Sequence, residues 1–371
     1  MSIPPLTIET VNTKDGVSRL QKVWDDLSRA SDIPNVFTTF DWFEAWNKRL
    51  EKAKRSGKRR PNILVLKDND AVVGISPLIR LTSFRMGIPA RQLRFVGHAW
   101  DYNDLVLGNG HADRIDAVVE HLARSQKEWD LIDLRDLRDT GNSIDLITSA
   151  LARAELPYRL LPEEERSPYM PIDGPWSEIL SRRSASTRHT FRNRQSRLDR
   201  MSVEGLRVRI INNPQDEPGL MERMVLVEAH KHVGGELSPP FLGVYSDVFE
   251  SLFDRLGPKG WISVAVMELG ERLLGWHLLF RCGEKLWGYL TAYDYAFSHL
   301  SPGTMLVPAI IDYGFSHGFT EYDFLNGEES YKMRWATGFH HTYRLLIWNR
   351  RWSSRLRAFL CLGLRPDRFP N

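Results

Sequence analysis

Side chains that can transfer protons gather near the C-terminal end of the sequence. Asp323 lies inside an apolar, strand-like segment, where a charged carboxylate is costly unless it is paired or used. Glu328 follows that segment and begins a predicted helix, which favours a general base, although the helix dipole alone also favours glutamate there. Tyr293 and Asp294 end an earlier strand-like segment, where a phenol is either a proton donor or half-buried packing. These residues predict acid–base chemistry, with structural pairing of Asp323 as the alternative.

Covalent and metal chemistry have weaker candidates. A thiol nucleophile would have to be Cys282, which has no evident partner. Cys282 and Cys361 are too few for a disulfide framework or a thiolate zinc site. His340 and His341 lack partners at ligand spacing, and no H-E-x-x-H occurs. We therefore expect no covalent intermediate and no metal.

Arginine is concentrated in one stretch. The segment 182–209 holds nine arginines against two acidic residues. A solvated helix face explains such a run by default, but arginine forks also bind phosphates through paired hydrogen bonds. Arg188, Arg192 and Arg194 are therefore candidates for holding a phosphorylated or lipid-pyrophosphate acceptor. An RNA acceptor end is a lesser option, because no ribonucleoprotein-type aromatic strand is present.

The elements that position these residues occur twice along the chain. Three pairs of strand-like or hairpin-like segments match in the same order: 62–75 with 262–276, 130–134 with 321–325, and 158–161 with 343–346. Apolar residues at helical spacing predict helices at 17–30, 41–53 and 111–126 in the first half, and at 218–233, 240–256 and 303–317 in the second. Each half thus contains a strand, two helices, three antiparallel strands, and then helices alternating with strands. This order predicts an α/β fold with a mixed sheet and helices on its faces.

Length and composition agree with this organisation. A chain of 371 residues predicts two domains. We place an N-terminal unit at 1–180, an Arg-rich helical connector at 181–205, a C-terminal unit at 206–350 and a basic tail at 351–371. With 50 Lys and Arg against 47 Asp and Glu, no overall field indicates DNA binding or a membrane coat. No targeting segment and no apolar run near the ~20 residues of a membrane span is visible, so we expect a cytoplasmic protein.

The order of elements resembles the GNAT superfamily of N-acetyltransferases, and its duplication resembles the tandem branch with FemABX-type transferases and CelD-type proteins of cellulose biosynthesis. The resemblance is carried by Ser301-Pro302-Gly303, by the run from Asp323 to Trp335, by an early Phe37-Thr38 with Trp42 and Trp46, and by the Arg-rich stretch from Ser186. It implies two tandem GNAT-like units, each with a mixed, mostly antiparallel sheet flanked by helices.

The resemblance also implies where a donor binds. Members of the superfamily usually hold acetyl-CoA or another acyl-CoA where the fourth and fifth strands separate, here between 286–294, which includes Leu290, and 322–325. Ser301, Gly303 and Thr304 open the adjoining helix, whose N–H groups suit a pyrophosphate. The loop departs from the family pattern because it has one glycine and no cation, and Ser301 with Pro302 is equally typical of an ordinary helix start.

Roles for the remaining residues follow from the same resemblance. Lys332 is the cation expected to meet phosphates or a developing oxyanion, unless it pairs with Glu328 on the helix surface. Tyr331 and Trp335 are expected to line the acceptor pocket or, as a helical stripe, to belong to the core. Asp294 would help to bind the substrate, and the Tyr293 hydroxyl would protonate the leaving group.

The resulting hypothesis is an acyltransferase whose C-terminal half carries the chemistry and whose N-terminal half shapes the acceptor side. The acyl group would pass directly from acyl-CoA to an amine or hydroxyl of a sugar or cell-envelope precursor. Two alternatives stay open. One is a FemABX-like transferase that uses aminoacyl-tRNA, and the other is a non-catalytic GNAT-like partner in polysaccharide biosynthesis or export, which the incomplete phosphate loop favours.

Overall fold

The computed structural model divides the chain into two compact units. Unit 1 comprises residues 1–165 and 340–371, and unit 2 comprises residues 166–339. The structure describes residues 6–31, 34–52, 59–85, 88–97, 102–107, 111–139, 142–203, 205–230 and 241–362. These units differ from the expected boundaries, because the strand that begins near Tyr343 belongs to unit 1 and the strand after Arg166 belongs to unit 2. The expected tail lies outside the described residues from 363 onward.

Unit 1 is a mixed sheet with helices on both faces. Its elements are β1 (Thr7–Val11), α1 (Lys14–Arg19), α2 (Gln21–Arg29), η1 (Val36–Thr38), α3 (Phe40–Lys52), β2 (Arg60–Asp68), β3 (Ala71–Arg85), β4 (Ile88–Phe95), β5 (Val106–Leu107), α4 (His111–Arg124), β6 (Leu131–Arg138), α5 (Ser143–Arg153), β7 (Tyr158–Pro162), β15 (Thr342–Trp348) and α14 (Trp352–Leu362). The strand order is β1-β2-β3-β4-β6-β15-β7, with β5 paired to β3. Helices α4 and α5 pack together over the core that contains Leu93 and Ile132, while α14 packs against β3, β4 and β6.

Two segments that the sequence repeat equates pair directly with each other in unit 1. Residues 343–347 of β15 run antiparallel to residues 158–162 of β7, and the other edge of β15 pairs with β6. Both segments contain the same run, Tyr-Arg-Leu-Leu, so either can fill a place in the sheet. The repeat predicted that each half would keep its own last strand, whereas β15 from the second half completes the sheet of unit 1.

The elements of unit 2 are β8 (Ser167–Pro171), α6 (Trp176–Ser181), α7 (Ala185–Ser202), β9 (Leu206–Ile211), η2 (Pro214–Asp216), α8 (Leu220–Ala229), α9 (Phe241–Val244), α10 (Ser246–Leu256), β10 (Ile262–Leu269), β11 (Arg272–Cys282), β12 (Lys285–Tyr293), η3 (Tyr295–Leu300), α11 (Pro302–Met305), α12 (Val307–Ser316), β13 (Glu321–Asp323), α13 (Ser330–Trp335) and β14 (Gly338–His340). From β9 onward, unit 2 follows an order of elements similar to that of unit 1, and β8, α6 and α7 precede it. The strand order is β14-β8-β13-β12-β11-β10-β9, with β14 at the division between the units.

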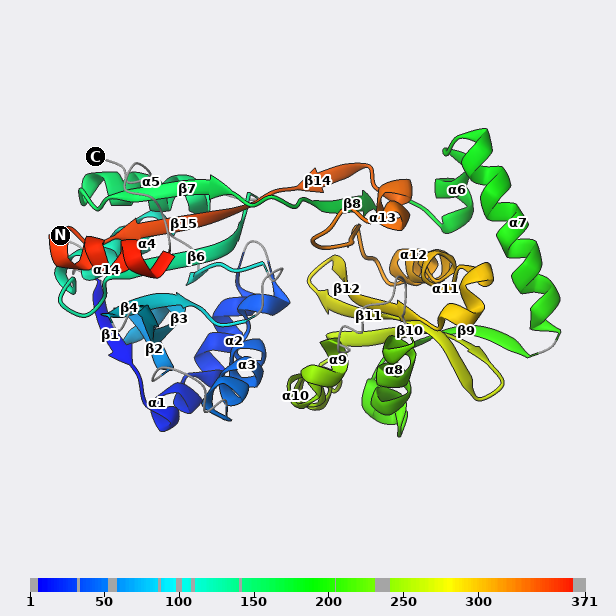
Figure 1. Ribbon diagram of the computed structural model, residues 1–371, viewed down its shortest axis with the longest axis horizontal. Helices are drawn as coiled ribbons and strands as arrows, with labels where there is room; N and C mark the ends of the chain where they lie inside the picture. Colours follow the sequence, from blue (N-terminus) through cyan, green and yellow to red (C-terminus); the bar gives the residue numbers. More distant parts are fainter. Residues whose placement is uncertain are drawn as a thin grey trace. The chain divides into compact units, whose positions relative to one another are not determined.

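Helices cover both faces of the unit 2 sheet. Helices α8 and α10 pack against β10, β11 and β12 on one face, and α11 and α12 lie on the other (Figure 1). The predicted helices 218–233, 240–256 and 303–317 correspond to α8, α9 with α10, and α11 with α12. The α/β fold with two mixed sheets is therefore confirmed.

Aromatic side chains fill much of the interior. Seven of the twelve tryptophans are less than 2% exposed within the described part of the chain. In unit 2, Trp176 packs edge-to-face against Trp335 with ring centres 4.7 Å apart, and both contact Phe191 of α7. Helix α7 is thereby anchored to unit 2 through its apolar face.

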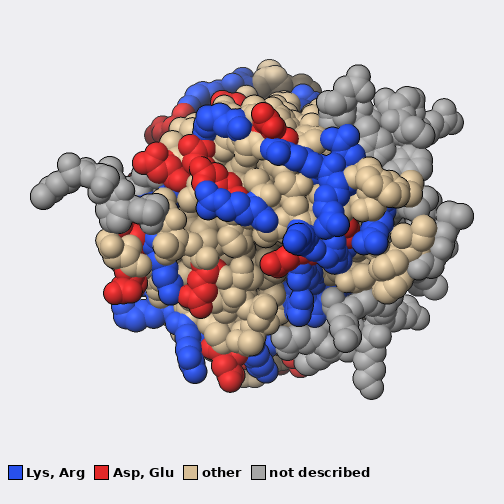
Figure 2. Space-filling model, turned by 90° about the vertical axis from the view of Figure 1, so that its left-hand side faces the viewer, with Lys and Arg blue, Asp and Glu red and all other residues tan. Residues whose placement is uncertain are grey.

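The surface carries both signs of charge. Figure 2 shows Lys and Arg side chains interspersed with Asp and Glu over one face, in keeping with a net charge of +3. In the described residues, no helix is both long and apolar enough to cross a membrane.

Candidate functional site

The parallel strands β12 and β13 separate soon after they begin to pair. Their register runs from Lys285–Glu321 to Trp287–Asp323, whereas β12 continues to Tyr293 with β11 on its other side. Among the described residues, no strand pairs with this edge of β12 beyond Trp287. Backbone groups along such an edge can bind an extended ligand as an added strand would. Leu290, expected at the donor, lies on this part of β12 and is partly buried.

A β-bulge marks the same part of β12. Leu278 of β11 pairs with Leu290, and Leu279 pairs with Gly288, so Tyr289 is an extra residue in the strand. Bulges re-aim neighbouring side chains and are frequent beside active sites. The sequence analysis did not predict this bulge.

Asp323 is fully buried at the end of β13. Its Oδ1 accepts a hydrogen bond from the backbone N–H of Leu325 at 2.8 Å. Leu325 has φ +56°, in the left-handed region that costs energy for a leucine. The carboxylate therefore stabilises the turn that leaves β13, which favours the structural interpretation of Asp323 over its role as an acid.

Lys332 is buried and holds that turn from the other side. Its Nζ donates to the backbone oxygen of Asn326 at 2.6 Å and lies 2.9 Å from Glu329 Oε2. Helix α13 begins at Ser330, so Glu328 lies outside it. The expected pairing of Glu328 with Lys332 on one helix face was wrong, because Glu329 takes that place one residue later.

Glu328 is paired with a different cation. Arg166 donates from Nε and Nη2 to its two carboxylate oxygens at 2.7 and 3.0 Å, and both side chains are about two-fifths exposed. The hydrogen bonds from Arg166 lower the pKa of Glu328 below its ordinary value. A carboxylate with a lowered pKa and both oxygens engaged is a weak base, so the geometry does not favour Glu328 as the general base.

Asp294 and Tyr293 differ in their availability at the end of β12. Asp294 is buried, accepts from the backbone N–H of Ala296 at 3.0 Å and pairs with Arg272 at 2.6 Å. Burial raises the pKa of Asp294, but the bonds from Arg272 and Ala296 outweigh burial and lower it overall. Asp294 thus caps the following turn. Tyr293, in contrast, stands beside Gly303: its Cδ1 would lie 3.9 Å from a Cβ built on that glycine.

The expected phosphate loop forms a tight entry into α11. Ser301 has φ +54° and its side chain makes no capping bond, while Pro302 is the first helical residue. The N–H groups of Thr304 and Met305 both donate to the Ser301 backbone oxygen at 3.0 Å. These two donors, expected to meet a pyrophosphate, already bond within the loop, which leaves the loop with less capacity for phosphate than predicted.

A cation that the loop itself lacks comes from α7. Arg197 donates from Nη1 to the backbone oxygen of His299 at 3.4 Å. Arg194 lies in the field of Arg197 and of Arg334, and burial together with these two cations lowers the pKa of Arg194. Sequence reasoning missed this arrangement because Arg197 and His299 are about a hundred residues apart in the chain and only the fold joins them.

The other expected ligand-binding residues of the connector and of α13 have structural partners or lie on the surface. Arg188 donates to the backbone oxygen of Ser181 at 3.2 Å, whereas Arg192 is exposed. Trp335 is 1% exposed and belongs to the core. It therefore does not line an acceptor pocket, and Tyr331 is only partly buried.

A buried histidine and tyrosine, which the sequence analysis did not single out, lie beneath the phosphate loop. Nε2 of His277 donates to the Gly303 backbone oxygen at 2.9 Å, which leaves Nδ1 to accept from the Tyr322 hydroxyl at 3.3 Å. Burial, followed by the charge of Lys332, lowers the pKa of His277 to about 4. Burial raises the pKa of Tyr322. Both groups are therefore neutral near pH 7, and His277 holds the first turn of α11 in place.

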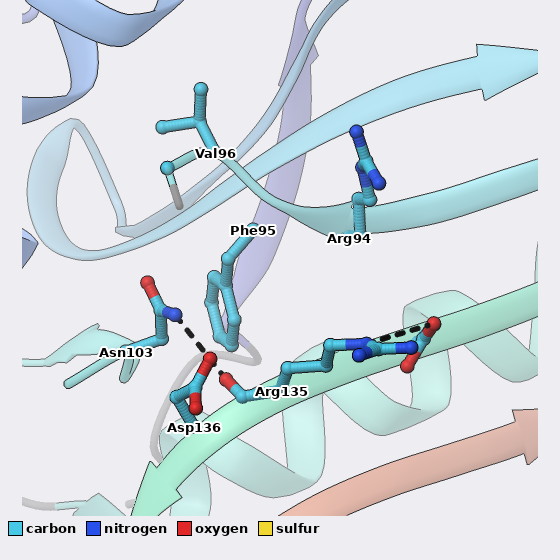
Figure 3. A pocket seen from close by; sticks show the side chains of 8 residues that line it. Arg94, Phe95, Val96, Asn103, Arg135 and Asp136 are labelled. Atoms are coloured by element: carbon cyan, nitrogen blue, oxygen red, sulfur yellow. Dashed lines mark hydrogen bonds and ion pairs between the residues drawn. The ribbon is translucent and has the colours of Figure 1, made fainter. Parts of the chain in front are cut away.

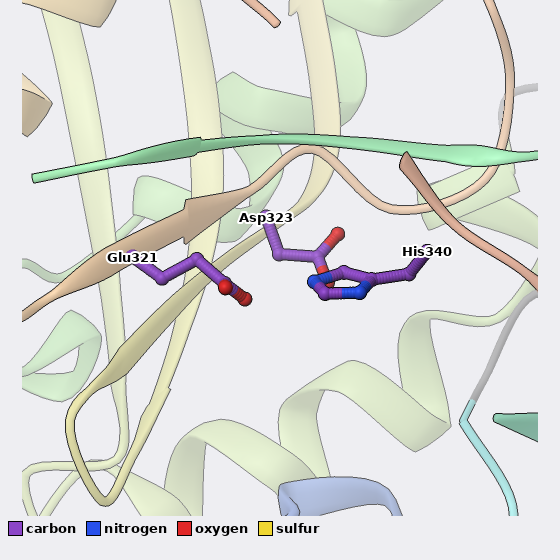
Figure 4. Close-up of side chains that lie close together, drawn as sticks. All are labelled: Glu321, Asp323 and His340. Atoms are coloured by element: carbon purple, nitrogen blue, oxygen red, sulfur yellow. The ribbon is translucent and has the colours of Figure 1, made fainter. Parts of the chain in front are cut away.

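Two other sets of side chains could react or bind a metal: the Cys282 thiol and a group of two carboxylates with a histidine. Burial raises the pKa of Cys282 to about 12, so the thiol does not supply a nucleophile. Glu321, Asp323 and His340 lie together, with one ligand atom from each within 4.8 Å of the others (Figure 4). Lys285 Nζ lies 2.9 Å from Glu321 Oε1, so the Glu321 carboxylate already forms an ion pair with a lysine of the protein.

Comparisons with known proteins agree with this geometry. Residues 185–333 match the family model described as an acetyltransferase (GNAT) domain. Among solved structures, FemX shares the fold with a TM-score of 0.62 and 13% identity, over 94% of this chain and 100% of that chain. A conserved protein of unknown function from Bacteroides thetaiotaomicron matches with a TM-score of 0.56 and 9% identity, over 92% of this chain and 100% of that chain. No curated protein sequence matches.

Both structural likenesses extend over nearly the whole chain, so they include the two units and not the matched domain alone. The order of elements, the early separation of β12 from β13 and the helix that starts beside them agree with the domain matched by the family model. Residues 185–333 therefore match a GNAT acetyltransferase domain, and the chain as a whole has a tandem GNAT-like fold.

Proposed function

We propose that unit 2 transfers an acyl group from acyl-CoA to an amine or hydroxyl group of a sugar or cell-envelope precursor. The observation that carries this proposal is the edge of β12 from Gly288 to Tyr293, which has no strand partner on the β13 side among the described residues. A pantetheine arm carries amide groups that can bond to such an edge. The edge leads to Gly303 and Tyr293, where the thioester would then lie.

The proposed reaction needs few protein groups. The nitrogen or oxygen of the acceptor attacks the thioester carbonyl and the carbon–sulfur bond breaks. Tyr293 is the proposed donor of a proton to the departing sulfur, so the products are the acylated acceptor and free CoA thiol. The proton that the acceptor loses passes to water, and water returns a proton to the Tyr293 phenolate after the step. Holding the two substrates in contact supplies much of the remaining acceleration.

The basic side chains of α7 support the donor part of the proposal. Arg197 reaches the loop at His299, with Arg194 and Arg334 in the same field. Guanidinium groups bind phosphate oxygens through paired bonds, and CoA carries three phosphates. These arginines would supply the positive charge that the loop sequence lacks.

Calorimetric titration with acetyl-CoA, together with release of CoA thiol in the presence of amine acceptors, tests the proposal. We expect saturable binding that Arg197→Gln weakens about five- to tenfold, about 1 kcal/mol, through loss of a charged contact. Arg200→Gln is the matched control, because Arg200 lies on the same helix and donates from Nε to the Ser196 backbone oxygen. Absence of binding to acyl-CoA would contradict the proposal.

Aminoacyl-tRNA is the second candidate donor. The backbone N–H groups of Thr304 and Met305 are already bonded, so the loop has fewer donors for a pyrophosphate than expected. The arginines of α7 can instead bind the phosphates of a nucleic acid. Charged tRNA in the same titration separates the donors. Binding of charged tRNA that falls steeply with salt, without binding of acyl-CoA, would favour the second candidate. Failure of both ligands to bind would favour a non-catalytic role.

A further inference from the structure

Unit 1 contains a pocket where β4 and β6 separate. These parallel strands pair only at Gln92–Leu131 and Leu93–Ile132. Beyond that point lies a cavity of about 210 Å³, shown in Figure 3 and lined by Arg94, Phe95, Val96, Gly97, Asn103, Asp133, Arg135 and Asp136. The pocket is built entirely from unit 1.

Asn103 in the pocket lining is bonded to the backbone of β6. Its backbone N–H donates to the Asp136 backbone oxygen at 3.1 Å, and its Nδ2 donates to the Arg135 backbone oxygen at 3.3 Å. Asn103 also forms an isolated parallel bridge with Leu137. The two strands are therefore held apart by a fixed spacer, so the cavity is a built feature of the fold.

Arg94 is the unusual residue of this pocket. Its Nε is buried and has no hydrogen-bond partner among the described residues. Burial, followed by the charge of Arg59, lowers the pKa of Arg94. The Nε of Arg59 is likewise buried without a partner among the described residues. Two cations with unsatisfied donors at one place cost stability unless a ligand completes them.

The nearby carboxylates do not neutralise this pair. Asp133 receives two bonds from Arg344, both of 2.8 Å, and lies 3.5 Å from Nε of Arg135. Asp136 is the second carboxylate of the lining. Counting Arg59, Arg94, Arg135 and Arg344 against Asp133, Asp136 and Glu163, whose charge also acts on Arg344, leaves one positive charge in excess.

We propose that this pocket of unit 1 binds a small oxyanion, a phosphate or carboxylate group, with Arg94 as its main ligand. The guanidinium fork matches the spacing of two oxygens on either group. Phe95 and Val96 add an apolar wall, so the anion belongs to a small organic molecule or to one end of a larger one. The proposal concerns unit 1 alone and does not depend on the activity proposed for unit 2.

Thermal unfolding and calorimetric titration of the full chain test the proposal, with sodium phosphate, glycerol phosphate and sodium acetate as probes against sodium chloride at equal ionic strength. The test variant is Arg94→Met, which keeps the length of the side chain and removes its charge. The matched control is Arg124→Gln. This substitution also removes one positive charge from unit 1, but at a side chain of α4 that is 79% exposed.

We expect wild type and Arg124→Gln to bind a probe saturably, and Arg94→Met to bind it at least about tenfold more weakly. Tighter binding of the phosphates assigns a phosphate ligand, and tighter binding of acetate assigns a carboxylate. Without any probe, Arg94→Met should unfold at a temperature about 2 °C or more above that of wild type, because an uncompensated buried charge is gone.

Two results would overturn the proposal. One is equal binding of every probe by wild type and Arg94→Met. The other is an unfolding temperature of Arg94→Met below that of wild type in the absence of probes, since that result would make Arg94 a structural residue whose partners stabilise the fold. The comparison of unfolding temperatures is informative even when the natural ligand is not identified.

Discussion

Each unit contains one parallel strand pair that separates after a few residues, yet the two openings are lined by opposite chemistry. In unit 1, β4 and β6 part around Arg94 and Arg135. In unit 2, β12 and β13 part above the neutral pair His277 and Tyr322. The same topology thus positions arginines in one unit and, in the other, a desolvated neutral histidine–tyrosine pair near the buried Asp323 and Lys332.

This difference separates binding from chemistry. Arginine stays charged at every accessible pH and suits the recognition of an anion. Neutral imidazole and phenol groups in a dry setting suit a reaction in which charge develops and disappears within one step. The acyl transfer proposed for unit 2 is consistent with this difference, and the following changes test the proposal, beginning with the largest expected effect.

Replacing Tyr293 should have the largest effect on turnover. We expect Tyr293→Phe to slow release of CoA thiol on the order of 10²-fold, because the variant lacks the proposed proton donor, and to leave acyl-CoA affinity unchanged. Tyr295→Phe is the control, since Tyr295 lies two residues away and is 52% exposed. Equal turnover of the two variants would remove Tyr293 from the mechanism and weaken the contrast between the units.

Acid should destabilise unit 2 through His277. Its pKa is about 4 in the folded protein against 6.5 ordinarily, so the unfolded chain binds the extra proton between these values. Stability should therefore be complete above pH 6.5 and should fall by up to about 3 kcal/mol as the pH drops to 4. The arginines of the unit 1 pocket contribute no such slope, because they stay charged throughout.

Urea unfolding at several pH values between 7 and 4 measures this loss. His277→Gln should flatten the pH dependence, since glutamine can still donate to the Gly303 backbone oxygen but does not titrate. His341→Gln removes an exposed histidine and should retain the slope of wild type. If His277→Gln keeps the full slope, His277 is not the group responsible.

Replacing Lys332 should have an intermediate effect on stability. Lys332→Met leaves the backbone oxygen of Asn326 without its donor, which should lower the free energy of unfolding by about 1–3 kcal/mol. Lys22→Met should change it little, because Lys22 is 92% exposed. Unchanged stability of Lys332→Met would show that the turn after β13 does not depend on this bond, and would return Lys332 to its expected role beside the substrate.

Much of the fold was predictable because it depends on local pattern. The helices at 41–53 and 303–317 and the hairpins at 62–75 and 262–276 follow from apolar spacing and turn residues. The exchange of β15 into the sheet of unit 1 was not predictable, because 158–161 and 343–346 carry the same pattern and either sheet accepts it. Choice between equivalent strands is made by long-range packing.

The candidate site was less predictable than the fold. In the sequence, His277 is indistinguishable from the other residues of a buried strand. Its hydrogen bond to the Gly303 backbone oxygen depends on where α11 packs in the fold. Arg197 joined the site through the placement of α7. Glu328 was expected to be a base because the sequence does not reveal Arg166, which lies 162 residues away in the chain. Partners distant in the chain decide whether a charged residue is free to act.

Glu328→Gln should have the smallest effect, and it separates the two interpretations of this residue. A general base would lose most of its turnover on this change, whereas the exposed pair with Arg166 should lose neither turnover nor measurable stability. Steady-state release of CoA thiol with Glu328→Gln and with Arg166→Gln measures the difference. Similar, near wild-type turnover in both variants would leave Tyr293 and the buried groups around His277 as the chemistry of unit 2. Selective loss in Glu328→Gln would instead show that a charged surface residue takes part, and the contrast between a charged pocket in unit 1 and a neutral one in unit 2 would fail.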